Sequence, residues 1–413
     1  MSLNSRSAFI AFGLVVNVLL LLRSLILMTV LDYAELGLIA LVQSTVLVIG
    51  MLHFGLLNGG YRLLCHANDR YRQRIIDLAW SVFAIVAGLI ALTLAATAIA
   101  LDNTELRWIA ALTALGGMAT LLRSWMTNEM VSVGKLAAAN IISAVATLAS
   151  LAALPFLEIH PALVATGSIV LHPIVFVMLA MVSGEVLRPR QWRFQKRLLK
   201  LIMRIGAVVF VAGLTVQLNT QMDRWFVTTE LGLDQLGRLY LAFLFITLFQ
   251  MFPTLLQQAF LPRIIQAWKG KQVPELRAEL RNYLLLVTAY CLAAALAVWL
   301  IAPPLVELVL PEYVADLRWV NLLMPGLIAF TIAAGFTFVF FTVVDFTWYL
   351  VAFVVGTLAT VVSLGAAWLG GYALDLDGVI VLRSAIYAVM GALLVLGWWR
   401  MTRRFPEFRV FDR

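Results

Sequence analysis

The chain has 413 residues, of which 63% are hydrophobic and only 13% are charged, and its mean hydropathy is +0.96. Soluble domains are roughly 45–50% apolar and about 25% charged, so this composition excludes a soluble globular protein. Inside lipid a backbone satisfies its hydrogen bonds only as a helix or a closed barrel, and the apolar runs here are continuous rather than alternating. We therefore predict an all-α polytopic membrane protein.

Twelve apolar runs are long enough to be spanning helices, which need about 20 residues each. In chain order they cover approximately 8–30, 36–58, 76–101, 107–127, 136–157, 162–187, 205–227, 237–261, 282–309, 319–341, 346–370 and 378–399. The first run is expected to be a retained span and not a removed signal peptide, because the chain after it reads TVLDYAE and offers no small-residue cleavage site.

The basic residues indicate an orientation. If the N-terminus is cytoplasmic, 24 of the 30 Lys and Arg residues lie on the inner side, including Arg123 at the inner end of the fourth run. The outer side holds only Arg107, Arg224, Arg238 and Arg318. This distribution predicts that both termini are cytoplasmic. The net charge of +8 and the pI near 9.7 then describe loops that face anionic lipid, and they do not imply a nucleic-acid partner.

Cysteine and histidine usage offers no metal or cofactor site. Cys65 falls on an inner loop and Cys291 inside a span, so the two cannot form a disulfide framework in this topology. No cluster of Cys, His and carboxylates has metal-ligand spacing, so no cofactor is expected. His53 and His172 are isolated within spans, and we interpret them as hydrogen-bonded interior histidines, with a ligand or proton-relay role as the alternative.

The chain repeats itself, which predicts two lobes of six helices each. The second span opens with AELGLIAL and the eighth with DQLGRLYLAF, while LRWIAALTALGGMA and LRWVNLLMPGLIAF begin the fourth and the tenth. Six crossings return the chain to its starting side, so the halves are predicted to be parallel repeats related by an axis along the membrane normal. The predicted domains are 1–187 and 205–413, joined by a basic cytoplasmic linker at 188–204 that contains RPRQWRFQKRLLK.

Two parallel six-helix lobes suggest a transporter that binds its substrate near the middle of the membrane and exposes it to each side in turn. Charged groups cost about 2.5–3.5 kcal/mol each at the centre of a span, so those that persist usually face an interior or a water-filled cavity. At helical spacing Gln217, Gln221 and Arg224 share one face of the seventh span, and Asn219 and Asp223 share the next. The predicted substrate-binding residues are Arg23, Arg383, Asn17, Gln43, Gln217, Asn219, Gln221, Asp223, Arg224 and Gln257.

Three arginines carry most of this prediction. Arg224 can snorkel to the headgroups and pair with the adjacent Asp223 or with lipid phosphate, so a structural role is favoured for it. Arg23 is deeper, roughly 10 Å from the outer end of its helix, and its expected partner is either Asp223 or an anionic cargo. Arg383 is intermediate between these two cases. Guanidinium groups and amides suit a substrate that carries a phosphate and hydroxyls, because arginine binds phosphate bidentately.

The segment QLNTQMDRWFVTTELGLDQLGRLYLAF, followed by a span that ends FLPRII, resembles the seventh and eighth spans of the Wzx-type polysaccharide flippases of the MOP superfamily. LVELVLPEYVADLRWVNLL is similar to the segment before their tenth span, although Pro311 and Glu312 stand before Tyr313 where the family usually has a glycine. ELGLIALVQSTVLVIGMLHFGLLNGGYRLL is similar to their second span. The resemblance implies a bacterial inner-membrane protein that moves an undecaprenyl-pyrophosphate-linked oligosaccharide outward for O-antigen, capsule or exopolysaccharide assembly. It implies membrane lipids as partners, with a polysaccharide polymerase and chain-length proteins as further ones.

Two other functions remain open at this stage. A MATE-like multidrug exporter would share the fold, but a lumen for cations should carry acids, and the deepest charge here is basic. A membrane-embedded polymerase or glycosyltransferase would need large outer loops with catalytic groups, whereas 228–236 and 310–318 are about nine residues long and contain no His. We therefore expect no enzyme activity.

Overall fold

The structure is a computed structural model that describes residues 3–65, 67–343, 345–370 and 374–410. Its first helices are α1 (Leu3–Val30), α2 (Tyr33–Gly50), α3 (Leu56–Leu64), α4 (Asp69–Ala100), α5 (Thr104–Ser132), α6 (Leu136–Leu151), η1 (Leu154–Phe156), α7 (Pro161–Val182) and α8 (Lys196–Glu230). The remaining helices are α9 (Leu233–Arg238), α10 (Tyr240–Lys269), α11 (Val273–Leu300), α12 (Ala302–Val309), η2 (Pro311–Tyr313), α13 (Leu317–Ala334), η3 (Gly335–Thr337), α14 (Phe338–Val343), α15 (Thr347–Gly370), α16 (Leu376–Arg404) and η4 (Pro406–Phe408). The described residues contain no β-strand.

The predicted class, an all-α polytopic membrane protein, is confirmed. Eleven helical segments of the described chain are long and apolar enough to cross a membrane. They correspond in order to the second through twelfth predicted runs, and the 28-residue α1 corresponds to the first. Short polar residues start several of these helices, because their side-chain oxygens accept hydrogen bonds from the first free N–H groups. Asp32, Asn68, Asn103 and Asp375 cap α2, α4, α5 and α16 in this way.

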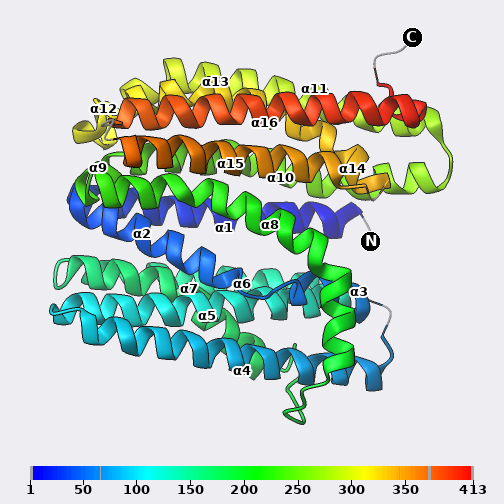
Figure 1. Cartoon of the computed structure of the whole chain (residues 1–413), viewed down its shortest axis with the longest axis horizontal. Helices are drawn as coiled ribbons and strands as arrows, with labels where there is room; N and C mark the ends of the chain where they lie inside the picture. Colours follow the sequence, from blue (N-terminus) through cyan, green and yellow to red (C-terminus); the bar gives the residue numbers. More distant parts are fainter. Residues whose placement is uncertain (1–2, 66, 344, 371–373, 411–413) are drawn as a thin grey trace. The chain divides into compact units, whose positions relative to one another are not determined.

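The chain forms two compact units, Met1–Gln217 and Leu218–Arg413. In the first unit α5 packs along α4 and α7, and in the second α16 packs along α13 and α15 (Figure 1). The boundary between the units lies within α8, which begins at Lys196. The last nine residues of the segment predicted as a linker, 196–204, are therefore the first turns of a long helix, since LLKLIMRI extends the apolar run of the seventh span toward its N-terminal end.

The second predicted span is broken into two helices. The chain leaves α2 at Gly50 and starts α3 at Leu56, with positive φ values of 48° at Phe54 and 85° at Gly55. Only glycine adopts the second conformation without a steric penalty. The carbonyl oxygen of Gly55 also lies so close to Gly206 on α8 that a Cβ on Gly206 would be only 2.1 Å from it. Glycines therefore permit both the break and the close approach of the two helices.

The two units share packing features that support the predicted repeat. In each unit the fourth and sixth spans cross where the fourth span carries a glycine. A Cβ on Gly116 of α5 would strike Val170 of α7, and a Cβ on Gly326 of α13 would strike the backbone of Ser384 on α16. The glycines lie ten and nine residues after Leu106 and Leu317, which start the repeated LRW motif.

In each unit the chain that follows the sixth span folds back onto the third span. After α7, the Asp77 carboxylate on α4 accepts a hydrogen bond from the backbone N–H of Arg190 at 2.8 Å. After α16, the Arg277 guanidinium on α11 donates to the carbonyl of Pro406 at 3.1 Å, and the rings of Trp268 and Phe408 lie 4.8 Å apart. The cytoplasmic segments predicted from charge alone are thus anchored to their own units.

Candidate functional site

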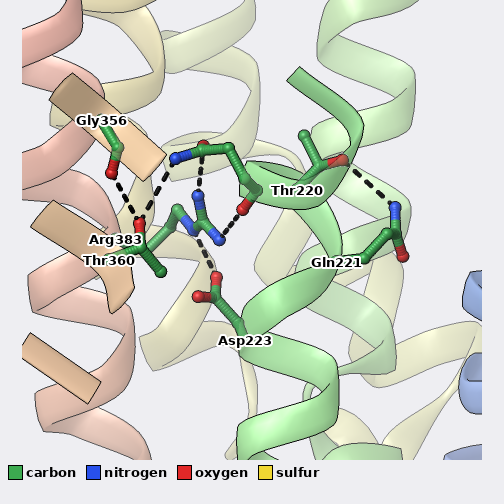
Figure 2. Close-up of polar contacts among 7 residues, drawn as sticks. Thr220, Gln221, Asp223, Gly356, Thr360 and Arg383 are labelled. Carbon is green, nitrogen blue, oxygen red and sulfur yellow. Dashed lines mark hydrogen bonds and ion pairs between the residues drawn. The ribbon is translucent and has the colours of Figure 1, made fainter. Parts of the chain in front are cut away.

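The second unit contains a buried arginine enclosed by oxygen atoms. Arg383 on α16 is only 3% exposed. Its Nε donates to the Asp223 carboxylate, its Nη1 donates to the side-chain oxygen of Asn219 at 2.6 Å, and its Nη2 donates to the backbone carbonyl of Asn219. Figure 2 shows Asp223 reaching this guanidinium group. All three guanidinium nitrogens therefore have protein acceptors.

A third helix completes the cluster. The side-chain nitrogen of Asn219 donates to Thr360 Oγ1 on α15 at 3.3 Å, and this hydroxyl donates to the carbonyl of Gly356 at 2.9 Å (Figure 2). The guanidinium carbon of Arg383 lies 5.4 Å from the ring centre of Tyr387. Sequence reasoning missed Thr360, Gly356 and Tyr387, because nothing in an apolar span marks which small or aromatic residue faces a distant charge.

The sequence left the partner of Asp223 open between Arg224 and Arg23. In the structure its carboxylate pairs with Arg383, 160 residues away. Consecutive helical residues point about 100° apart, so an adjacent acid and base do not face each other. The Arg224 guanidinium instead lies 4.3 Å from the ring centre of Phe243 on α10, a cation–π contact.

The Asp223 carboxylate and the Arg383 guanidinium group form a buried ion pair. One carboxylate and one guanidinium group cancel, and Asp223 and Asn219 are 6% and 1% exposed. Pairing of this kind makes two buried charges tolerable in a low-dielectric interior, provided that their remaining hydrogen bonds are satisfied. The arrangement can hold α8, α15 and α16 together, with three of the five guanidinium N–H donors of Arg383 directed at protein oxygens.

The other residues predicted in the second half do not join the cluster. Gln221 is buried and donates to the hydroxyl of Thr220 at 3.2 Å, on another face of α8 (Figure 2). Gln257, on α10, is half-buried. Three predicted residues lie on earlier parts of the chain: Asn17 on α1, Gln43 on α2 and Gln217 on α8. Each of them is half-buried.

Arg23 lies within the first unit, against α7. It is 9% exposed, and its Nη1 donates to the backbone carbonyl of Ser168 at 3.4 Å. Because Asp223 pairs with Arg383, the acid that the sequence suggested as a partner for Arg23 already has another partner. The depth predicted for Arg23, about two turns from the end of α1, agrees with the helix boundary at Val30.

A second arginine of the first unit, Arg123, lies further inside its helix than the end of the predicted run at 127 suggested. Counting positive charges put Arg123 at the inner edge of the membrane, but it lies nine residues before the end of α5, about 14 Å along the helix. Its Nη1 is 3.1 Å from Nδ1 of His172, which lies near the middle of α7, and its Cζ is 6.0 Å from the ring centre of Phe176. The sequence around Arg123 gives no indication of its position within the helix. The isolated His172 was the one signal that a polar partner lies inside this unit.

The two arginines meet the same helix one turn apart. Ser168 and His172 are an i, i+4 pair on α7, so Arg23 and Arg123 attach about 6 Å apart along its axis. Two buried carboxylates of this unit lie elsewhere: Glu129 on α5 accepts from the backbone N–H of Leu187, and Asp77 on α4 accepts from that of Arg190, both at 2.8 Å. The charged side chains that contact the middle of α7 are thus both basic, and such a site can attract anions.

The comparisons with known proteins identify the fold. No family model matches the chain, and no curated protein matches it. An inward-facing multidrug resistance MATE family transporter of the MOP superfamily aligns with a TM-score of 0.75 at 14% identity, covering 95% of each chain. The lipid II flippase MurJ in an inward closed conformation aligns with a TM-score of 0.73 at 12% identity, covering 94% of this chain and 87% of that one. A MATE structure in the straight conformation aligns with a TM-score of 0.62 at 16% identity, covering 97% of this chain and 95% of that one.

At these identities the likeness shows the fold alone. The chain is a multi-pass membrane protein with the all-helical fold of the MATE transporters and the lipid II flippase. The membership in the Wzx-type branch that its motifs imply remains a prediction.

Proposed function

We propose that this protein is a flippase that moves an undecaprenyl-pyrophosphate-linked oligosaccharide across the bacterial inner membrane by alternating access, for cell-surface polysaccharide biosynthesis. One observation carries the proposal. The charged side chains that contact the middle of α7 in the first unit, Arg23 and Arg123, are both basic, and the carboxylate of the buried cluster in the second unit, Asp223, pairs with an arginine. Deep charged residues mark substrate pathways, and this charge sign suits an anionic cargo.

A lipid-linked diphosphate fits this charge better than a cationic drug does. Guanidinium groups bind phosphate oxygens through paired, charge-assisted hydrogen bonds. The likeness to a lipid II flippase supports a lipid-linked cargo for this fold. The half-buried amides Asn17, Gln43 and Gln257 would add hydrogen-bonding groups for sugar hydroxyls.

A MATE-like multidrug exporter is the second candidate, because MATE transporters are among the structures that share this fold. An exporter of cationic drugs would need accessible carboxylates in its membrane interior. Asp223 is 6% exposed and its charge is compensated by Arg383. The arrangement of charges therefore favours the flippase.

A polymerase or glycosyltransferase is disfavoured by the connections between helices. α8 ends at Glu230 and α9 begins at Leu233, so this outer connection is shorter than the sequence suggested. Between α12 and α13 the chain forms the short helix η2 and then enters α13 at Leu317. Neither connection offers room for a sugar-processing site.

A gene deletion tests the proposal. The undecaprenyl-pyrophosphate-linked oligosaccharide should accumulate in the cytoplasmic leaflet of the deletion strain, and the surface polysaccharide should be lost. A plasmid-borne copy of the gene should restore both. Normal surface polysaccharide without accumulation would count against the flippase, and sensitivity to cationic drugs in the same strain would favour the exporter.

A further inference from the structure

Three arginines lie together at the end of α16 that is predicted to be cytoplasmic. Arg400, Arg403 and Arg404 follow one another at helical spacing in its last two turns, and all three are exposed. The C-terminal end of a helix dipole favours cations, but like charges at this spacing repel one another. An anion bound among these side chains would relieve the repulsion, so the end of α16 is a candidate anion site.

Tryptophan rings hold two of the three guanidinium groups. The Cζ atom of Arg400 lies 4.7 Å from a ring centre of Trp348 on α15, and the Cζ atom of Arg403 lies 3.6 Å from a ring centre of Trp399. A cation–π contact orients a guanidinium group without neutralising its charge. Within the described ranges, no salt bridge involves either arginine. Both groups therefore keep a positive charge and N–H donors for a ligand.

The Trp348 side chain is positioned by close packing against α16. A Cβ on Gly397 would lie only 2.5 Å from the Cβ and 2.7 Å from the Cγ of Trp348, so the tryptophan occupies the space that a side chain at 397 would fill. Gly397 precedes Arg400 by three residues, which puts the two on one face of the helix. The half-buried Trp348 is thus fixed beside Arg400 by the fold of the second unit.

Arg404 differs from the other two arginines because an acid lies near it. Its Cζ is 5.5 Å from the ring centre of Phe405, and Asp345, in the connection before α15, is close enough to attract it electrostatically. Its charge is therefore partly compensated within the protein, and the candidate site is centred on Arg400 and Arg403.

Exposed apolar side chains continue from these arginines toward the membrane interior. Leu396 and Trp399 are 38% and 45% exposed, and they lie one helical turn before Arg400 and Arg403. Tryptophan is enriched at membrane–water interfaces, which is the level of lipid headgroups. A phosphate held by the two arginines would have its hydrocarbon chains beside this apolar surface. This continuity favours a membrane lipid over a soluble phosphate.

We propose that Arg400 and Arg403, held by Trp348 and Trp399, bind the headgroup phosphate of an anionic phospholipid whose chains lie along α16. Arginine binds phosphate oxygens through paired donors, and basic clusters at the cytoplasmic side of membrane helices bind anionic headgroups. The site belongs to the second unit and does not include the buried Arg383. The inference goes beyond the transport function proposed above and does not depend on which cargo is carried.

Lipid titrations of the full-length protein test the site. The purified protein in neutral detergent is titrated with phosphatidylglycerol or with phosphatidylcholine of the same chain length, and native mass spectrometry measures the bound lipid. The wild type should bind phosphatidylglycerol about tenfold more tightly than phosphatidylcholine. The double variant Arg400→Gln, Arg403→Gln should lose that preference, because both phosphate contacts are removed. A wild type without the preference would overturn the inference.

Two controls separate a site from a diffuse attraction of anions. The double variant Lys269→Gln, Lys271→Gln removes two exposed charges from the same predicted side of the second unit, and it should bind phosphatidylglycerol within about twofold of the wild type, because salt screens separated surface charges. Arg318→Gln removes an exposed arginine that pairs with Asp377, and it should also bind as the wild type does. Equal losses in the lysine and arginine double variants would overturn the site.

Variants of Trp348 test the positioning role of the ring at constant net charge. Trp348→Leu should weaken phosphatidylglycerol binding about threefold to fivefold, whereas Trp348→Phe keeps a ring and should stay within about twofold of the wild type. Melting temperatures without added lipid show whether each variant is folded. Wild-type affinity in a folded Trp348→Leu variant would show that the ring does not position Arg400.

Soluble phosphate is the other source of the same chemical group. Glycerophosphoglycerol has the phosphate and glycerol groups of phosphatidylglycerol without its chains, and it should not displace the lipid at equal concentration. Displacement would show that the site binds a soluble phosphate, and the assignment to a lipid would be wrong. None of these outcomes bears on the flippase function, which is tested separately by lipid-linked oligosaccharide accumulation in the deletion strain.

Discussion

The buried pair of Asp223 and Arg383 makes a quantitative prediction about stability. Arg383→Met leaves the Asp223 carboxylate buried without its cation, which should lower the free energy of unfolding by about 3–5 kcal/mol. Asp223→Leu leaves the guanidinium group bound to two oxygens of Asn219, so its cost should lie near the lower end of that range.

The double variant Asp223→Leu, Arg383→Met should be more stable than either single variant. It removes both charges and leaves mainly the two oxygens of Asn219 without donors, at a cost of about 1–3 kcal/mol. Denaturant unfolding of the purified protein in mild detergent, together with its abundance in membranes, measures the three variants. The combination Asp223→Leu, Arg224→Met is the matched control and should recover less, because the hydrogen-bonded partner of Asp223 is Arg383. Recovery with Arg224→Met that equals or exceeds recovery with Arg383→Met would refute the pairing.

Three further perturbations follow from the packing and the topology. Glu129→Ala removes the acceptor for the loop after α7, so it should lower stability by about 1.5–3 kcal/mol and speed tryptic cleavage within 188–193, while Glu129→Gln should cleave at the wild-type rate. Gly326→Ala should destabilise the second unit by about 1–3 kcal/mol through its clash with α16, whereas Gly365→Ala, where a Cβ meets no atom within 4 Å, should be harmless by melting temperature. Cys65, which is exposed, should react with an impermeant maleimide only after permeabilisation of cells, and Thr229→Cys should react without it, with the reverse pattern inverting the predicted orientation.

Run length and composition were sufficient to predict the spans. A helix in lipid must be both apolar and long, so each span appears in the sequence as a continuous apolar run. The break at Phe54 and Gly55 was not predictable, because HFGLLNGG reads as apolar and the positive φ angles depend on packing against Gly206. The anchored loop after α7 was missed for a similar reason, since Asp77 and the backbone of Arg190 are 113 residues apart.

The candidate site was predictable only along single helices. Spacing placed Asn219 and Asp223 on one face of α8, and both bind the same guanidinium group. Their partner Arg383 lies on another helix 160 residues away, and no local pattern connects the two. Arg123 was assigned to the membrane edge because a count of positive charges uses position along the chain and does not measure depth.

Reconstituted flipping is the most direct test of the proposed function. Purified protein in sealed liposomes would receive undecaprenyl-pyrophosphate-linked oligosaccharide in the inner leaflet, and an external lectin would report the sugars that reach the outer surface. The account predicts that the lectin-accessible fraction rises with time in wild-type liposomes and in those with Arg318→Gln, and rises much more slowly with Arg123→Gln. A rate in wild-type liposomes no higher than in protein-free liposomes would contradict the flippase assignment.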